Sequence, residues 1–350
     1  MTAPRLSRKA RLIGMALLAL VLYCTLGAIV YAVSLVALQQ GTRIDLPWFT
    51  AAQKSLYRNG HVNVSNWLGI PGCIKPDPDL IYVPSHGTCA FDDIEFKTTL
   101  TFSAEGRDTG PKPAGAGIAV IGDSHAMGWG VNDTETFAAQ LQALSGRPVY
   151  NLGVASYGTT RELIRLQKSG VLDKVDTIVL QYCNNDMREN LQFDGASRQA
   201  LHDKVFGPKP PPAPPAPPAP PAPPAPPNRL AQLADGYGYA LAAPFRSLSE
   251  SLRRKNFEPH YEALMPVLEQ HRELLAGKRV IAFYANPYGQ RYRNFPSGPD
   301  ATIPNVEFVD LGLTPADHRK LDNHMTPAGH RKVAERLYAH LQTRSTEKPD

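Results

Sequence analysis

One short apolar run, and the turn that ends it, constrain the fold of this chain more than any other feature. Residues 117–121 are uniformly apolar or glycine, and Gly122-Asp123-Ser124-His125 follow directly. Such a run, stopped by turn residues, is typical of a buried strand in a parallel sheet. Ser124 is thus predicted at the carboxyl end of a strand, where open α/β sheets place their chemistry. A plain turn capped by Asp123 and Ser124 explains this run equally well.

The alternation of strands and helices continues along the chain. Further strands are predicted at 149–153, 176–183, 279–284 and 306–311, and helices at 134–144, 159–168 and 258–276, the last kinked at Pro266. Strands that alternate with helices favour a parallel sheet covered by helices on both faces. The sequence therefore predicts an α/β fold.

A serine hydroxyl needs a base, and the base needs a group that orients it. His324 precedes a long amphipathic helix, with Thr326 as its expected N-cap and Pro327 at its first position. Histidine is the natural base near neutral pH, so His324 is the candidate base and the nearby Asp322 the candidate orienting group. A solvated loop histidine is the rival interpretation. His330, inside the helix, is expected to be structural or solvated.

Two further strand ends offer groups that could hold an oxyanion. Gly153 could present a backbone N–H that a substrate can approach closely, since it has no Cβ. Asn185, just after another strand, could point its amide into the same crevice. Taken singly, Gly153 is equally a strand-to-helix turn and Asn185 an Asx turn.

These segments together resemble the SGNH/GDSL hydrolases, which carry a Ser, a Gly, an Asn and a His in four ordered blocks. The blocks are Gly122-Asp123-Ser124, Asn151-Leu152-Gly153, Asn185-Asp186 and Asp322-Asn323-His324, over residues 116–190 and 278–342. The resemblance implies a flavodoxin-like three-layer α/β/α fold with about five parallel strands. It implies Ser124 as nucleophile and His324 as base, with an oxyanion hole from the N–H groups of Ser124 and Gly153 and the Asn185 side chain. It calls for no metal or organic cofactor.

Two blocks depart from the family pattern. Cys183 stands where the third block usually has glycine, and Asp322 precedes His324 by two residues rather than three. The shorter spacing resembles membrane-anchored SGNH proteins and envelope-polysaccharide O-acetyltransferase relatives. Asp317 and Asp310 are alternatives for orienting the imidazole. His125 either touches substrate or has a packed or solvated role.

The N-terminus carries a candidate membrane anchor. A basic tail, residues 1–11, precedes an uncharged and largely apolar stretch from Leu12 to Leu38. At 1.5 Å per residue this stretch is about 40 Å long, enough to cross a bilayer core of about 30 Å. The basic flank predicts a cytoplasmic N-terminus and a single-pass inner-membrane protein whose remaining chain is periplasmic. A cleaved signal peptide is the rival, although the stretch is longer than signal-peptide cores usually are.

Cysteine usage and charge narrow the class of protein. Cys73 and Cys89 could form a disulfide outside the cytoplasm, or could be two free thiols. Cys24 lies in the apolar stretch, and no cysteine or histidine spacing fits zinc. The net charge of +5 is modest and shows no nucleic-acid footprint. The oligomeric state cannot be read from these patterns.

The remaining segments suggest a domain plan. Residues 39–115, with β-like runs at 80–83 and 96–102, are predicted to form a small β-rich extension before a hydrolase-like domain at 116–345. An insertion at about 195–256 contains Ala-Pro-Pro repeats at 210–227. Proline cannot join a sheet or helix interior, so these repeats are expected to extend as polyproline II over roughly 55 Å. A semi-rigid spacer is favoured over a docking site for a proline-reading partner.

The leading hypothesis is acyl-ester chemistry, as a serine esterase or an O-acyltransferase acting on an envelope glycan or lipid. The alternative is a membrane-anchored protein that binds glycans, or assists assembly, on a hydrolase scaffold without catalysis. The sequence disfavours a third interpretation, a metallophosphatase, because it shows no convincing cluster of metal ligands.

Overall fold

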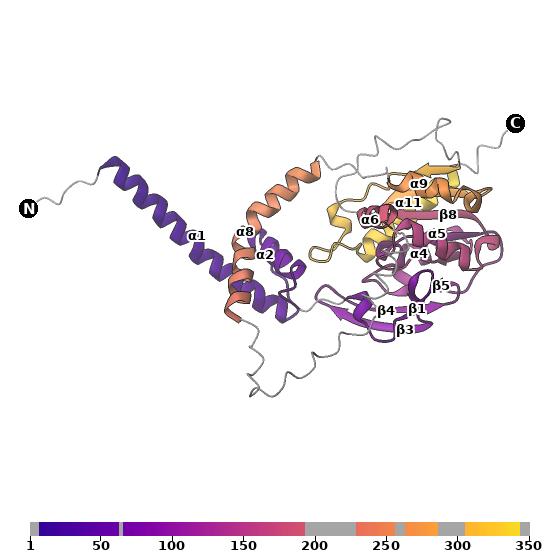
Figure 1. Cartoon of the computed structure of the whole chain (residues 1–350), viewed down its shortest axis with the longest axis horizontal. Helices are drawn as coiled ribbons and strands as arrows, with labels where there is room; N and C mark the ends of the chain where they lie inside the picture. Colours follow the sequence, from indigo (N-terminus) through magenta and orange to yellow (C-terminus); the bar gives the residue numbers. More distant parts are fainter. Residues whose placement is uncertain (1–6, 63–65, 193–228, 256–262, 286–304, 344–350) are drawn as a thin grey trace, which may run out of the picture. The chain divides into compact units, whose positions relative to one another are not determined.

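The computed structural model describes residues 7–62, 66–192, 229–255, 263–285 and 305–343 (Figure 1). The chain divides into two units. The first comprises Met1–Val64, Pro215–Arg253 and Lys320–Asp322, and the second comprises Ser65–Pro214, Arg254–Arg319 and Asn323–Asp350. The Ala-Pro-Pro repeats lie outside the described residues.

An eight-stranded sheet is the centre of the second unit. Its order is β10-β9-β8-β6-β7-β5-β4-β3, and the strands from β10 to β7 are parallel while β5, β4 and β3 are antiparallel. The parallel part has the flavodoxin-like order predicted above. The strands are β3 (Gly87–Asp93), β4 (Phe96–Ser103), β5 (Gly106–Arg107), β6 (Gly117–Ile121), β7 (Val149–Asn151), β8 (Val175–Tyr182), β9 (Arg279–Tyr284) and β10 (Val306–Phe308).

Helices cover both faces of the parallel strands, as the alternation of buried side chains requires. On β6, Ala119 and Ile121 pack with α5 (Thr159–Lys168) and α9 (Leu264–Gln270). Ile118 and Val120 face the other way and pack with α4 (Phe137–Ser145) and α11 (Pro327–Thr343). Since successive strand residues point to opposite faces, a strand buried on both sides must be apolar throughout. The three-layer α/β/α fold is confirmed.

Two helix boundaries differ from those predicted. The helix expected at 134–144 begins at Phe137, after a 3₁₀ turn (η2, Asp133–Glu135), because the Thr136 hydroxyl caps it by accepting from Ala139 N–H at 3.1 Å. The helix expected to kink at Pro266 instead breaks at His271, between α9 and α10 (Arg272–Leu275). Pro266 lies in the first turn of α9, where proline costs no hydrogen bond.

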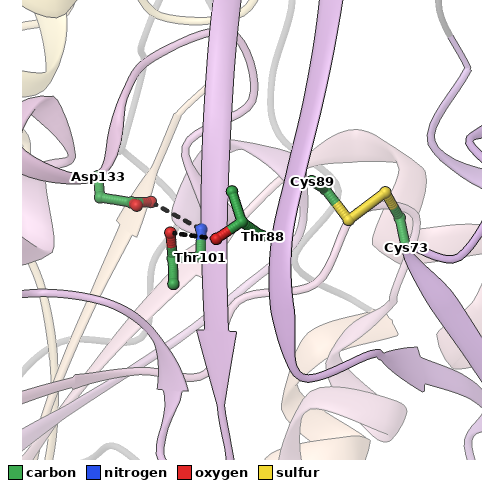
Figure 2. Close-up of a disulfide and its surroundings, with 5 residues drawn as sticks. All are labelled: Cys73, Thr88, Cys89, Thr101 and Asp133. Atoms are coloured by element: carbon green, nitrogen blue, oxygen red, sulfur yellow. Dashed lines mark hydrogen bonds between the residues drawn. A yellow bond between two sulfur atoms is a disulfide. The ribbon is translucent and has the colours of Figure 1, made fainter.

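A disulfide joins two parts of the β-rich segment that precedes β6. Cys73, just before β1 (Ile74–Asp77), is bonded to Cys89 on β3, with 5.7 Å between their Cα atoms (Figure 2). β1 pairs with β2 (Ile81–Pro84), and a core of aromatic and aliphatic side chains, among them Trp67, Tyr82 and Phe91, fills this segment. On the neighbouring β4, Thr101 N–H donates to Asp133 Oδ1 at 3.1 Å (Figure 2).

Three helices form the described part of the first unit: α1 (Arg8–Gln39), α2 (Pro47–Arg58) and α8 (Arg229–Lys255). α1 is one continuous helix, long and apolar enough to cross a membrane, as the sequence predicts. Two of these helices differ from expectation. α2 lies within residues expected to be β-rich, and α8 lies in the insertion, where no helix is predicted.

Reducing the disulfide is predicted to destabilise the second unit. The two cysteines are 16 residues apart. Opening a disulfide loop of this length typically lowers the free energy of unfolding by about 3 kcal/mol. Adding dithiothreitol should therefore lower the urea midpoint of the wild-type chain. A Cys73→Ala/Cys89→Ala variant should start from the lower midpoint and show no further response, and Cys24→Ala should behave like wild type. Equal midpoints for oxidised and reduced wild type would contradict this prediction.

Candidate active site

Ser124 and His324 meet although they are 200 residues apart. The Ser124 Oγ lies 2.7 Å from His324 Nε2, a hydrogen-bond distance. Ser124 is the first residue of α3 (Ser124–Met127), directly after β6, and the Asp123 side chain caps this helix by accepting from His125 N–H at 2.9 Å. The Ser124 N–H is thus one of the amides that a helix leaves without an internal partner at its N-terminus.

A buried glutamine fixes the turn that carries the serine. Gln181 on β8 is fully buried, and its Oε1 accepts from Asp123 N–H at 3.1 Å and from Ala126 N–H at 2.9 Å. Gly122 has a φ of 150°, and a Cβ there would lie 2.6 Å from the same oxygen. Only glycine therefore fits the turn. Gln181 could not be singled out from the sequence, because the same strand also carries Asp176 and Thr177.

Asn151 and Gly153 hold the other side of α3. The Asn151 amide donates to Ala126 O at 3.0 Å, and its Oδ1 accepts from Gly153 N–H at 3.1 Å. A Cβ on Gly153 would overlap the backbone nitrogen of Met127, so glycine is required for the close approach of the two segments. In this arrangement the Gly153 N–H already has an acceptor. To donate to an oxyanion as well, the Gly153 N–H would have to form a bifurcated hydrogen bond or give up its bond to Asn151 Oδ1.

The third block is arranged around Asp123. Asn185 is exposed, at the start of α6 (Asn184–Gln192), and its side chain hydrogen-bonds to the Asp123 carboxylate. Burial raises the pKa of Asp123, while the His125 N–H, the charge on His324 and the Asn185 amide oppose that rise. Asp186 Oδ2 accepts from Cys183 N–H at 3.2 Å. Cys183, at the family's glycine position, is buried and outside the disulfide, and it contributes its backbone to this contact.

The loop that carries His324 is tied down by its own backbone. Arg319 N–H donates to His324 O at 2.8 Å, His318 pairs with Met325 in a short antiparallel bridge, and Thr326 N–H donates to Asp317 O at 2.9 Å. The Thr326 hydroxyl accepts from Gly329 N–H at 3.1 Å, which confirms it as the cap of α11.

Arg319 links this loop to two other segments. Its guanidinium donates to Glu95 O at 2.7 Å, between β3 and β4, and to Gly130 O at 2.5 Å, in the segment after α3. Gly130 lies six residues after Ser124, and Arg319 lies five residues before His324. Arg319 therefore links the segment that carries the serine to the loop that carries the histidine. Arg319 could not be identified from the sequence, because contacts between residues this far apart in the chain produce no periodic pattern.

Trp129 and Arg107 join the β-rich segment to the site. The Trp129 ring stacks on Phe91 with centroids 4.3 Å apart, and its centroid lies 6.1 Å from that of His324. Arg107, completely buried, donates to Met127 O and Gly128 O at 2.6 Å each and to Asp133 Oδ1 at 2.8 Å. These contacts attach the β-rich segment, which lies outside the four sequence blocks, to the segment that follows Ser124.

Three other histidines surround His324 or lie near it. His125 is buried with its ring centroid 4.8 Å from that of His324, and burial lowers its pKa well below the usual value. His318 places its ring nitrogens 2.9 Å from Thr314 O and 2.8 Å from Ala285 O. His330 is buried, and its Nδ1 accepts from Phe137 N–H at 3.2 Å, so its expected structural role is confirmed.

The carboxylate that would orient His324 stays a prediction. Asp322 is half-buried and belongs to the short stretch Lys320–Asp322. Of the two alternatives, Asp317 accepts from Thr314 N–H at 2.7 Å and pairs with Lys332 at 2.8 Å. Asp310 Oδ1 accepts from Gly312 N–H at 2.7 Å. Both carboxylates therefore serve local turns.

Within the described residues, no group of three or more His, Cys, Asp and Glu side chains is arranged to hold a metal ion. The site consists of a hydroxyl, an imidazole and several amide hydrogens. Such a set can do nucleophilic chemistry on a carbonyl carbon without further groups.

Comparison with known proteins gives structural neighbours only. No protein-family model and no curated protein matches the sequence significantly. A G-D-S-L family lipolytic protein from Desulfitobacterium hafniense is 12% identical, with a TM-score of 0.33 over 64% of this chain and 99% of that chain. An acetylxylan esterase from Geobacillus stearothermophilus, solved as a catalytic mutant, is 14% identical, with a TM-score of 0.31 over 65% and 95%.

A third neighbour is a carbohydrate esterase family 2 enzyme with a carbohydrate-binding domain from Corynascus thermopiles. It is 13% identical, with a TM-score of 0.35 over 68% of this chain and 69% of that chain. The structural neighbours are thus GDSL-type and other esterases, the kind of protein that the four blocks resemble. At these identities and scores they carry no argument about activity, which rests on the side chains described above.

Replacing Gly153 by alanine is predicted to reduce turnover by about 10²-fold, because the new Cβ displaces α3 and with it the Ser124 hydroxyl. Steady-state hydrolysis of a short-chain aryl ester would measure this. Gly69→Ala is the matched control, since a Cβ at Gly69 meets nothing within 4 Å. Wild-type turnover in Gly153→Ala would show that the close approach of the two segments is not needed.

Acidification is predicted to destabilise the folded chain through its buried histidines. Burial lowers the pKa of His125 and of His330 well below the usual value, so the unfolded chain binds protons that the folded chain does not. The stabilisation is present above about pH 6.5 and is lost as the pH falls below it, by at most about 1.4 kcal/mol per pH unit for each histidine.

Urea midpoints measured from about pH 7 to about pH 5 test this expectation. His330→Asn, which retains an acceptor but does not titrate, should flatten the dependence. His86→Asn, at an exposed position, should leave it unchanged. An identical slope in wild type and His330→Asn would remove His330 from the account.

Proposed function

We propose that this protein is a serine esterase or O-acyltransferase that acts on acyl esters. The observation that carries the proposal is the 2.7 Å contact between the Ser124 hydroxyl and His324 Nε2. A base at this distance can take the serine proton as the hydroxyl attacks, which is what makes serine a competent nucleophile. The Asn185 side chain and the Ser124 N–H support the same chemistry, since both are amide donors at the turn that carries the serine.

The reaction follows from these groups in two halves. Ser124 Oγ bonds to the ester carbonyl carbon while His324 takes the hydroxyl proton. The tetrahedral intermediate places its oxyanion near the Ser124 N–H, the Asn185 side chain and the Gly153 N–H. Its collapse breaks the ester C–O bond, and the leaving alcohol takes the proton from His324. Water or a second hydroxyl then attacks the acyl-serine carbonyl and gives its proton to His324. The bond between that carbon and Ser124 Oγ breaks, and Ser124 Oγ takes the proton back from His324 as the acyl product leaves. Asp322 would hold the imidazole in the tautomer that leaves Nε2 free to accept.

The acceptor in the second half decides between the two activities. Water makes the protein an esterase, and a sugar hydroxyl makes it an O-acyltransferase. An envelope glycan or lipid is the preferred substrate class, because α1 would keep the enzyme at a membrane and because the Asp-x-His spacing resembles envelope acetyltransferase relatives.

The proposed location is the inner membrane, with the catalytic unit on the periplasmic side. Basic residues precede α1, which favours a cytoplasmic N-terminus. The Cys73–Cys89 disulfide supports an oxidising compartment for the rest of the chain, since such bonds are rare in the cytoplasm.

One observation favours the non-catalytic alternative. The Gly153 N–H is engaged by Asn151 Oδ1, and Cys183 occupies the family's glycine position, so the oxyanion site departs from the expected pattern at two places. A glycan-binding protein on this scaffold would bind its ligand without turnover. Binding of a polysaccharide with equal affinity by wild type and His324→Ala, without ester hydrolysis by either, would establish that alternative.

Kinetics on the full chain in detergent test the enzyme proposal. Ser124→Ala and His324→Ala are each predicted to lower kcat on a short-chain aryl ester by at least about 10³-fold, because either change removes the activated nucleophile. Ser145→Ala, at the end of α4, is the matched control and should retain wild-type turnover. Unchanged turnover in Ser124→Ala would remove Ser124 from its role.

A further inference from the structure

Exposed apolar side chains gather on two helices of the first unit. Among the described residues, every large apolar side chain that is clearly exposed lies on α1 or α8, apart from Leu46 and Leu144. On α8 the exposed fractions reach 66% for Phe245, 61% for Leu248 and 56% for Leu252. Such a concentration is unusual on a surface that faces water and marks a contact with an apolar partner.

α8 packs directly against the apolar part of α1. The Tyr237 hydroxyl donates to Cys24 O at 2.8 Å, and the Tyr23 hydroxyl donates to Leu241 O at 2.5 Å. Gly27 on α1 faces the Leu241 side chain so closely that a Cβ there would overlap it. All of the α1 residues in this contact lie within the uncharged stretch from Leu12 to Leu38. Small residues that let two helices approach are typical of helix pairs in membranes.

Aromatic side chains from α1 and α2 reinforce this contact. The Tyr23 and Trp48 rings stack with centroids 5.1 Å apart, and Trp48 Nε1 donates to Ala240 O at 3.0 Å.

The sequence of α8 is that of an amphipathic helix beyond this contact. Leu241, Phe245, Leu248 and Leu252 recur every three or four residues and so form one stripe. Arg246, Glu250 and Arg253 recur with the same spacing on another. Mixed charges beside an apolar stripe of leucine and phenylalanine are typical of helices that lie at a membrane surface.

We propose that α8 is a second membrane-binding element, whose Phe245–Leu248–Leu252 stripe contacts lipid beside α1. The proposal rests on the membrane attachment of α1 proposed above. Its occupant is the bilayer because α8 touches α1 between Tyr23 and Tyr31, so lipid that surrounds this part of α1 also reaches α8. The chain would then return to the membrane between the third and fourth blocks of the hydrolase-like domain.

Fluorescence quenching on the full chain tests the proposal. The chain, in a Cys24→Ala background, is reconstituted in vesicles of phosphatidylcholine and phosphatidylglycerol. Cys183 is buried and Cys73 is bonded to Cys89, so an introduced cysteine is the accessible thiol. An environment-sensitive fluorophore is attached at Leu248→Cys, with Ser247→Cys as the matched control on the same helix. Leu18→Cys on α1 reports separately on the anchor.

The two membrane elements give distinguishable results. Lipid-borne quencher is expected to reduce emission several-fold more at position 248 than at position 247, with aqueous iodide showing the reverse. Iodide quenching without lipid quenching at position 248 would overturn the proposal, and so would protection from both, which would indicate a covering protein surface or a second copy. Absence of lipid quenching at position 18 would instead refute the anchor, whereas the result at position 248 decides the role of α8.

Discussion

The candidate site depends on one hydrogen bond, between the Ser124 hydroxyl and His324 Nε2. Neither residue is held by its own neighbours alone. The serine turn is fixed from beneath by Gln181, whose single side-chain oxygen accepts two N–H groups. The histidine loop is held by Arg319, which reaches two carbonyls in segments far away in the sequence. A hydroxyl and an imidazole react only when both are placed to within a fraction of an ångström, so these buried polar contacts matter more than added apolar area.

The β-rich segment before β6 belongs to the same machinery. It extends the parallel sheet through β5, β4 and β3, and Arg107 on β5 saturates carbonyls in the segment that follows the serine. Trp129 from that segment stacks on Phe91 of β3 near the His324 ring. The disulfide restrains this same segment. Loss of the disulfide is therefore expected to weaken the same segment that contacts Trp129 and the carbonyls after Ser124.

Much of the fold could be predicted because buried parallel strands are continuously apolar and stop at turn residues. β6 was readable for that reason. The pairing of Ser124 with His324 was implied by the resemblance of the four blocks to SGNH/GDSL hydrolases. Gln181, Asn151 and Arg319 were not assigned positioning roles, because single polar residues give no periodic signal. α8 was not predicted because two glycines and Pro244 interrupt its pattern, and contact with α1 stabilises what local propensity does not.

Trapping the covalent intermediate tests the central claim most directly. The full chain is mixed with a short-chain aryl ester, quenched in acid and analysed by peptide mass spectrometry. The account predicts one acyl group on the Ser124 hydroxyl, absent in Ser124→Ala and formed much more slowly in His324→Ala. Acylation at another residue, or turnover of the ester with Ser124 never modified, would contradict it.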